Sequence, residues 1–274
     1  MKTKHIVTLF LVCFSLQLLA QQHPLVGTWE FISMKATNSD GSKISADAYK
    51  ETKIITPTHY FFIAHRKQGD SLVFEKAVAG TVRVEGNQYN EQPLYFSQEG
   101  TDKAKRDITY KLDGDRLIEQ GTLTFPDGKV IKIDELVFKR VKEDKTVKNP
   151  AIGTWSHLSS SGVNEKGEKW STTNATHSIF QTITPTHWMR INYKDNKFEN
   201  AYGGTYRMEG NKIYPNFEMI SFTPPRDLKV EVVQSLEANK LQWNVIVNNE
   251  NGKSVFENVF EKADAKMAKT SSTK

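Results

Sequence analysis

The chain is almost free of cysteine, because Cys13 is the only one among its 274 residues. Cys13 lies near the amino terminus, so the rest of the chain contains no thiol that could form a disulfide, and packing must stabilise the fold. The chain also has no Gly-x-Ser-x-Gly motif, no His-x-His pair and no clustered cysteines. These absences exclude the usual signatures of a serine hydrolase and of a zinc site, and the sequence predicts neither a metal nor a cofactor.

Long apolar runs are also missing, except for one at the amino terminus. Lys2 and Lys4 precede the run from Ile6 to Leu19, which ends beside Ala20. A basic start, a short apolar run and a small residue are typical of a secretory signal. We therefore expect a signal peptide over residues 1–20 and an exported protein, periplasmic or extracellular. The run is too short to predict stable membrane insertion.

No sign of charge dominates the chain. The 37 basic and 32 acidic residues give a net charge of +5, and Lys2 and Lys4 contribute two of the positive charges. No basic block with interleaved aromatic residues occurs, so nucleic acid is not an expected partner. Residues 264–274 are small, polar and lysine-rich, which predicts a disordered tail. The oligomeric state is left open by these features.

A repeated pentapeptide organises the chain. Ile55–His59 reads Ile-Thr-Pro-Thr-His, and Ile183–His187 repeats it. Gly-Thr-Trp precedes both copies, at Gly27–Trp29 and Gly153–Trp155, and Glu-Gly-Asn follows both. A period this long indicates two complete domains rather than solenoid repeats. We expect the first domain over residues 21–142, a charged linker over 143–150 and the second domain over 151–263.

Each domain is expected to be all-β. Short alternating apolar stretches follow one another with turn residues between them, for example Gly86-Asn87 and Asp113-Gly114. No segment shows a helical period over three turns, and the loops are short. About eight to nine antiparallel strands at even spacing in each domain predict two tandem up-and-down β-barrels.

The alternation along the strands also predicts which side chains face the barrel interior. After each proline-marked turn, the apolar phase begins at a histidine, His59 or His187, and we expect this phase to point inward. The predicted interior side chains, which could line a small-molecule site, are His59, Phe61, Ile63, Val82, Glu91, Tyr95, His187, Met189, Ile191, Tyr193 and Tyr206. The alternative is that the histidines are hydrogen-bonded core residues with no ligand.

The start of each domain carries a resemblance to a known superfamily. Gly-Thr-Trp resembles the Gly-x-Trp signature of the lipocalins and their relatives, the calycins. The resemblance implies that Trp29 closes the barrel floor and that Arg140, from the last strand, packs over it. In the second domain it implies the same for Trp155, with Lys262 in place of the arginine, which makes a weaker or different lid.

The longer pattern of Gly-Thr-Trp, Thr-x-Thr-His, Gly-Thr-Tyr or Gly-Thr-Val, and Glu-Gly-Asn resembles compact lipocalin-like domains of secreted bacterial proteins. This implies barrels that hold a small apolar or amphipathic ligand. Two further hypotheses stay open. The barrels could be filled by their own aromatic side chains and serve as interaction modules, or His59 and Glu91 could act together in an enzyme on a small molecule or glycan. The sequence marks no catalytic pair, so enzymatic activity is the less favoured hypothesis.

Overall fold

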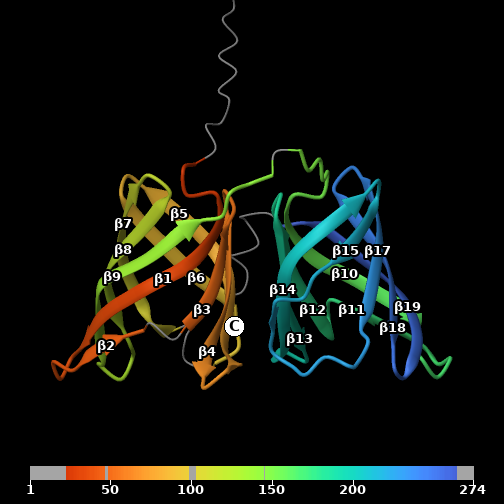
Figure 1. Cartoon of the computed structure of the whole chain (residues 1–274), viewed down its shortest axis with the longest axis horizontal. Helices are drawn as coiled ribbons and strands as arrows, with labels where there is room; N and C mark the ends of the chain where they lie inside the picture. Colours follow the sequence, from red (N-terminus) through yellow and green to blue (C-terminus); the bar gives the residue numbers. More distant parts are fainter. Residues whose placement is uncertain (1–22, 47–48, 99–102, 145, 264–274) are drawn as a thin grey trace, which may run out of the picture.

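The computed structural model describes residues 23–46, 49–98, 103–144 and 146–263 and shows two closed antiparallel β-barrels side by side (Figure 1). The strands make up both barrels, and the described residues contain no α-helix. No helix among them is long and apolar enough to cross a membrane. The predicted signal peptide and the predicted tail lie outside the described residues.

Barrel 1 is a ring of eight strands, closed where β9 pairs with β1, and it carries β2 at its edge. The strands run in sequence order around the ring, as expected for an up-and-down barrel. They are β1 (Gly27–Asn38), β2 (Lys43–Ser45), β3 (Tyr49–Ile55), β4 (His59–Gln68), β5 (Ser71–Glu85), β6 (Gln88–Phe96), β7 (Lys105–Asp113), β8 (Arg116–Thr124) and β9 (Val130–Arg140).

Barrel 2 repeats this topology, and β19 pairs with β10 to close it. Strands β11 and β16 lie outside the ring of eight, β11 beside β10 and β16 beside β14. The strands are β10 (Gly153–Val163), β11 (Lys169–Thr173), β12 (His177–Ile183), β13 (His187–Lys194), β14 (Lys197–Glu209), β15 (Lys212–Pro215), β16 (Met219–Ile220), β17 (Lys229–Glu237), β18 (Lys240–Asn249) and β19 (Gly252–Lys262).

The Gly-Thr-Trp motif forms the floor of each barrel. The Trp29 indole is fully buried and donates to the Leu25 carbonyl at 2.8 Å. The Arg140 guanidinium lies 4.1 Å from the centre of the Trp29 ring and also donates to the Val26 carbonyl. Gly27 is required beside it, because its φ is +143° and a Cβ there would lie 2.7 Å from Arg140 Nη1. The cation therefore seals the floor through a cation–π contact and a backbone hydrogen bond.

The floor of barrel 2 has the same plan with a lysine. The Trp155 indole donates to the Ala151 carbonyl at 2.8 Å, four residues back as in barrel 1. Lys262 Nζ lies 4.4 Å from the centre of the Trp155 ring and donates to the Ile152 carbonyl. A single ammonium replaces the fork of the guanidinium, so this floor is held by fewer hydrogen bonds than that of barrel 1.

The Thr-Pro-Thr-His motif forms the hairpin that joins β3 to β4 in barrel 1 and β12 to β13 in barrel 2. Thr56 Oγ1 accepts from the backbone N–H of His59 at 3.0 Å, and the Thr56 N–H donates to the His59 carbonyl. Thr184 and His187 make the same pair of bonds. Each histidine Nδ1 lies within hydrogen-bond distance of the preceding threonine hydroxyl, at 2.7 Å and 2.9 Å. The motif is therefore a local turn structure in both copies.

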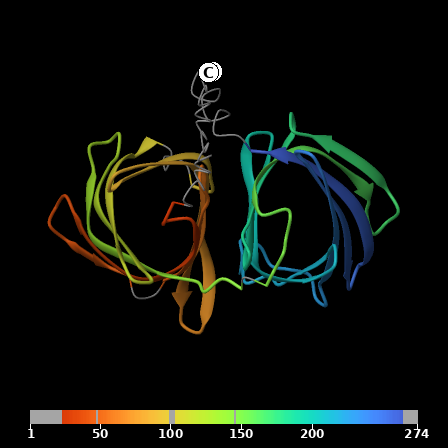
Figure 2. The ribbon, with the colours of Figure 1, turned by 90° about the horizontal axis from the view of Figure 1, so that it is seen from above.

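An apolar layer joins the two barrels. Figure 2, seen from above, shows two rings with β3 and β4 of one facing β13 and β14 of the other. Phe180 of barrel 2 stacks on Phe61 and on Tyr95 of barrel 1, with ring centres 4.9 Å apart in both pairs. The buried side chains of this layer are Ile54, Phe61, Ile63, Ala77, Ala79, Phe180, Met189, Ile191, Tyr193, Ala201 and Met219.

The two repeated motifs meet across this layer in a reciprocal way. Thr28, from the first Gly-Thr-Trp, lies 3.0 Å from Thr184 of the second Thr-Pro-Thr-His. Thr154, from the second Gly-Thr-Trp, lies 3.4 Å from Thr56 of the first Thr-Pro-Thr-His. Gly-Thr-Trp of each barrel thus contacts Thr-Pro-Thr-His of the other barrel. Such a reciprocal pair of contacts is the arrangement of a two-fold interface between like subunits.

The predicted inward phase of β4 and β13 is wrong. His59, Phe61 and Ile63 face barrel 2, and Met189 and Ile191 face barrel 1. The interior-facing residues of β4 and β13 are those of the opposite phase, such as Tyr60 and Trp188. Alternation separated the two faces correctly, but the more apolar face packs against the neighbouring barrel and not around the lumen.

Candidate functional site

Barrel 2 contains a cavity of about 320 Å³ that runs from its buried interior to one rim. Phe222, Pro225 and Asn249 line its outer end, and Phe222 is 38% exposed. This end lies opposite the Trp155 floor, because β18 starts beside the floor at Lys240 and ends at Asn249. Most of the wall is apolar, formed by Ile213, Phe217, Leu228, Val230, Val232, Val245, Val247 and Phe256. The volume falls at the lower end of the range of small-molecule sites, about 300–1,000 Å³.

A buried arginine lies at the inner part of this cavity. Arg190, on β13, is only 5% exposed, and its guanidinium lies 5.3 Å from the centre of the Trp243 ring. Its Nε and Nη2 both donate to Gln181 Oε1, at 3.1 and 2.6 Å, and its Nη1 donates to Tyr202 Oη at 3.3 Å. No carboxylate of the described residues lies within ion-pair distance of Arg190, which is unusual for a buried charge.

Three other polar atoms of residues that line this cavity have no hydrogen-bond partner among the described residues. They are Trp188 Nε1, Trp243 Nε1 and Asn192 Oδ1, and all three side chains are buried. Buried Trp N–H groups normally have a partner, since leaving one unsatisfied costs about 1–3 kcal/mol. The cavity lining therefore includes two unpaired donors, the indole N–H groups, and one unpaired acceptor, Asn192 Oδ1.

The interior of barrel 1 is arranged differently, around a buried lysine with carboxylate partners. Lys53 Nζ lies 2.9 Å from Glu119 Oε1 and 3.1 Å from Glu91 Oε1, and Glu91 also accepts from Tyr89 Oη at 2.8 Å. The Lys53 ammonium lies over the Phe138 ring at 4.8 Å. Burial disfavours its charge, but Glu119 and Glu91 outweigh that effect and raise the pKa of Lys53. Burial raises the pKa of Glu119 to about 7, against the attraction of Lys53.

Strand register identifies the equivalent positions of the two interiors. Lys53 pairs with Trp29, and Gln181 pairs with Trp155, so these two residues correspond. In the same way, Glu91 pairs with Val82 in barrel 1, and Pro215 pairs with Tyr206 in barrel 2. Glu91 and Pro215 therefore occupy equivalent positions. The register also matches Glu119 to Trp243 and Phe62 to Arg190. Barrel 2 therefore has its buried cation, Arg190, at a different position from Lys53, and it has Pro215 and Trp243 where barrel 1 has Glu91 and Glu119.

The residues proposed from the sequence to line a site divide into three groups. Val82 and Glu91 lie in barrel 1, and Tyr206 lies in barrel 2, where its hydroxyl donates to the Thr184 carbonyl at 2.6 Å. The remaining ones lie in or beside the layer between the barrels: His59, Phe61, Ile63, Tyr95, His187, Met189, Ile191 and Tyr193. None of the eleven lines the barrel 2 cavity.

His59 and Glu91 are not brought together. His59 faces the same side of the barrel 1 wall as its partner Thr81, and its ring lies 5.3 Å from that of Phe180. Glu91 faces the opposite side with Val82. Burial lowers the pKa of His187, whose surroundings include Glu218 and Glu30, so this ring favours its neutral form. The geometry gives His59 and Glu91 no joint role in catalysis.

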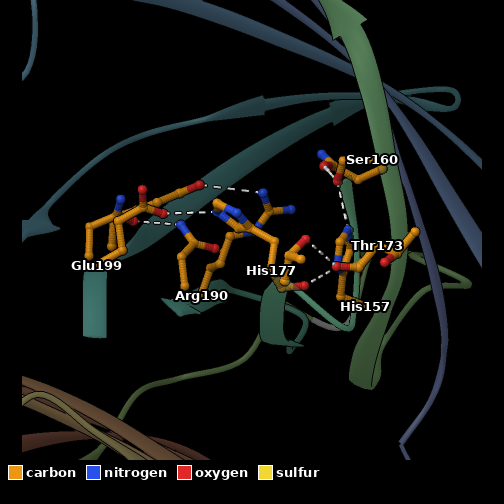
Figure 3. Close-up of polar contacts among 11 residues, drawn as sticks. His157, Ser160, Thr173, His177, Arg190 and Glu199 are labelled. Atoms are coloured by element: carbon orange, nitrogen blue, oxygen red, sulfur yellow. Dashed lines mark hydrogen bonds and ion pairs between the residues drawn. The ribbon is translucent and has the colours of Figure 1, made fainter. Parts of the chain in front are cut away.

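A serine and a histidine do meet inside barrel 2, as Figure 3 shows. His157 Nε2 lies 2.7 Å from Ser160 Oγ, and His157 Nδ1 lies 2.7 Å from the His177 carbonyl. Ser160 Oγ also bonds Asn258 Oδ1 at 2.7 Å, and burial lowers the pKa of His157. A nucleophile and a base can have this spacing. However, neither side chain lines the cavity, and both are about 95% buried, so we interpret the group as a structural network.

Sequence reasoning missed the residues that form the cavity. The expectation that the apolar phase of β13 points inward leaves Arg190 and Asn192 on the opposite face, whereas the structure places them in the lining of the barrel 2 cavity. The available signal was the unusual apolarity of the other face of β13, where Met189, Ile191 and Tyr193 follow one another. A strand that is buried on both faces indicates a neighbour on the outside of the barrel. No group of three or more possible metal ligands occurs among the described residues.

Comparison with protein-family models and with curated protein sequences gives no match. Among solved structures, the chain is similar to a protein of unknown function from the DUF3598 family of Nostoc punctiforme, at 11% identity and a TM-score of 0.28, over 87% of this chain and 96% of that one. It is also similar to a double mutant of transferrin binding protein B from Haemophilus parasuis, at 7% identity and a TM-score of 0.27, over 86% of this chain and 76% of that one. At such low scores, the function has to be inferred from the geometry of this chain alone.

Proposed function

We propose that this protein is a binding protein whose second barrel holds a small apolar or amphipathic molecule. The observation that carries the proposal is the apolar cavity of about 320 Å³ inside barrel 2. Small-molecule sites are mostly apolar concavities with a few placed polar groups, and Arg190, Asn192 and Asn200 supply such groups here. At about 30 Å³ per water-sized unit, the cavity suits roughly ten non-hydrogen atoms.

Barrel 1 is assigned a different role within the same proposal. Its lumen contains the Lys53–Glu91–Glu119 cluster together with large buried side chains such as Tyr60 and Tyr89. Small barrels are commonly filled in this way. Its outer face provides half of the apolar layer that holds barrel 2. We therefore propose that barrel 1 supports barrel 2 and does not itself hold the ligand.

Export remains part of the proposal and depends on the sequence of residues 1–20. The basic start and the apolar run up to Leu19 favour secretion, which would place the binding site outside the cytoplasm. The mass of the mature amino terminus, measured on protein purified from the host that produces it, tests this. Cleavage after Ala20 is the expected result.

The binding proposal is tested with eight-carbon probes of suitable size. Octan-1-ol and octanoate are titrated separately into the full chain, and tryptophan fluorescence is followed because Trp188 and Trp243 line the cavity. A saturable change with at least one probe is expected. Val245→Phe adds a ring to the cavity wall and should weaken that binding by about tenfold or more, since it removes much of the space.

Val255→Phe is the matched control, because Val255 lies on β19 with 42% of its surface exposed and does not line the cavity. It should leave binding unchanged. Absence of saturable binding for both probes, or equal binding by the wild type and Val245→Phe, would show that the barrel 2 lumen is not a ligand site.

A further inference from the structure

We propose that the ligand of barrel 2 is a small amphipathic carboxylate, whose anionic head group binds Arg190, Trp188 and Trp243 at the inner end of the cavity. This inference rests on the proposed function above and names the chemical class of the ligand. The first observation is the charge of Arg190. Its guanidinium is buried among aromatic rings, and no carboxylate of the described residues pairs with it.

The second observation is the comparison between the two barrels. In barrel 1 the interior cation, Lys53, is neutralised by Glu91 and Glu119. The corresponding positions of barrel 2 are Pro215 and Trp243, and both line the cavity next to Arg190. Barrel 2 therefore has a buried cation, at the position of Phe62 rather than of Lys53, and its cavity extends to the two positions where barrel 1 has carboxylates. A carboxylate carried by a ligand would restore the pairing that barrel 1 makes within its own chain.

The third observation is the number of hydrogen-bond donors without a partner among the residues that line the cavity. Arginine has five N–H donors, and Gln181 and Tyr202 accept only from some of those on Arg190. Trp188 Nε1 and Trp243 Nε1 add two donors without partners. An ionised carboxylate only accepts hydrogen bonds, and it binds a guanidinium fork well. The inner end of the cavity thus matches a carboxylate in both charge and hydrogen bonding.

The remaining cavity suits an apolar tail that points toward the rim. From Arg190 the wall continues through apolar side chains such as Val247 and Phe256 to Phe222 at the exposed end. With the head group at Arg190, a chain of about eight carbons would lie along this wall, given a volume of roughly ten non-hydrogen atoms. The ligand would therefore bind with its charged end inward.

The experiment compares octanoate, octan-1-ol and octylamine on the full chain at pH 8, with tryptophan fluorescence as the signal. Octanoate is expected to bind about tenfold or more tightly than octan-1-ol, because a charge-assisted bond to a buried cation replaces a neutral one. Octylamine is expected to bind more weakly than either. If octan-1-ol or octylamine binds as tightly as octanoate, the carboxylate inference is wrong while the binding function stands. If none of the three binds, the proposed function is wrong as well.

Three variants identify the groups responsible. Arg190→Met removes the charge and should abolish the preference for octanoate over octan-1-ol, while Arg207→Met, at an exposed arginine of the same barrel, should leave it intact. Pro215→Glu places a carboxylate at the position equivalent to Glu91, so Arg190 gains an internal partner, and octanoate affinity should fall about tenfold or more. This variant retains Arg190, so it tests the inference even if Arg190→Met fails to fold. A preference for octanoate that persists in Pro215→Glu would overturn the inference.

Discussion

At the scale of single residues, the two lumens differ mainly in how each neutralises a buried cation. Lys53 has two carboxylates within 3.1 Å, and three glutamates, Glu51, Glu91 and Glu119, influence its charge. Burial raises the pKa of both Glu51 and Glu119, against the attraction of Lys53 and, for Glu51, of Lys76 as well. A proton is therefore retained in the barrel 1 lumen up to about pH 7, the pKa of Glu119.

This retained proton predicts a pH dependence of stability. The pKa of Glu119 is about 7 in the folded chain, above its usual value of 4.5, so the folded state binds more protons between these values. Its contribution to stability is complete below about pH 4.5 and is lost as the pH rises through 7. Glu119→Gln should remove this loss, so the variant should gain stability relative to the wild type between pH 5 and pH 8. Urea unfolding at several pH values measures it.

The control for this prediction is Glu237→Gln, because Glu237 is exposed at the end of β17. Its unfolding free energy should follow that of the wild type across the same pH range. Parallel curves for Glu119→Gln and the wild type would contradict the assignment of the retained proton to Glu119.

At the scale of an element, the Thr-Pro-Thr-His hairpin has two roles. Its first threonine accepts from the backbone N–H three residues later, which closes the turn. The same hydroxyl reaches across to a threonine of the other barrel, as Thr184 does to Thr28. The same short polar side chain closes the turn and makes the contact between the barrels. This double requirement explains why a threonine occupies the equivalent positions 56 and 184.

Replacing Thr184 with valine should test both roles with little change in shape. The variant leaves the buried His187 N–H without its partner and breaks the bond to Thr28, so it should cost about 1–3 kcal/mol of unfolding free energy. The double mutant Thr28→Val with Thr184→Val should cost less than the sum of the single changes, because the two hydroxyls share a bond. Thr223→Val, at an exposed loop position, serves as control. Additive losses in chemical denaturation would argue against the direct contact.

At the scale of the whole molecule, the two barrels pack against each other through one buried apolar layer and are not independent domains. Phe180 is its central ring, since it contacts His59, Phe61 and Tyr95 of barrel 1. Tyr193 of barrel 2 also hydrogen-bonds to the backbone of Phe96, and His65 Nε2 lies 2.8 Å from the Ile220 carbonyl. The barrels are therefore expected to unfold together.

Truncation of the central ring tests this coupling. Phe180→Ala should lower the unfolding free energy by about 3–5 kcal/mol, the scale for removing a large core side chain. Because the ring lies between the barrels, hydrogen exchange should become faster in strands of both, including β4 and β6 of barrel 1. Phe222→Ala, at a partly exposed phenylalanine of barrel 2, should have a much smaller effect. Faster exchange confined to barrel 2 would contradict a shared core.

The sequence by itself determined the repeat, the all-β class and the two barrels, because these depend on local turn residues and on alternation within a strand. The resemblance to lipocalins implied the pairs Trp29 with Arg140 and Trp155 with Lys262, and in the structure each cation lies over its ring. Only the tertiary structure decided which face of β4 and β13 is the lumen, because both faces are buried and hydrophobicity no longer distinguishes them. It also decided which buried cation has a carboxylate partner. Lys53 pairs with Glu119, 66 positions away, whereas the Arg190 guanidinium lies over the Trp243 ring. These contacts depend on strand register across the ring, which no local pattern encodes.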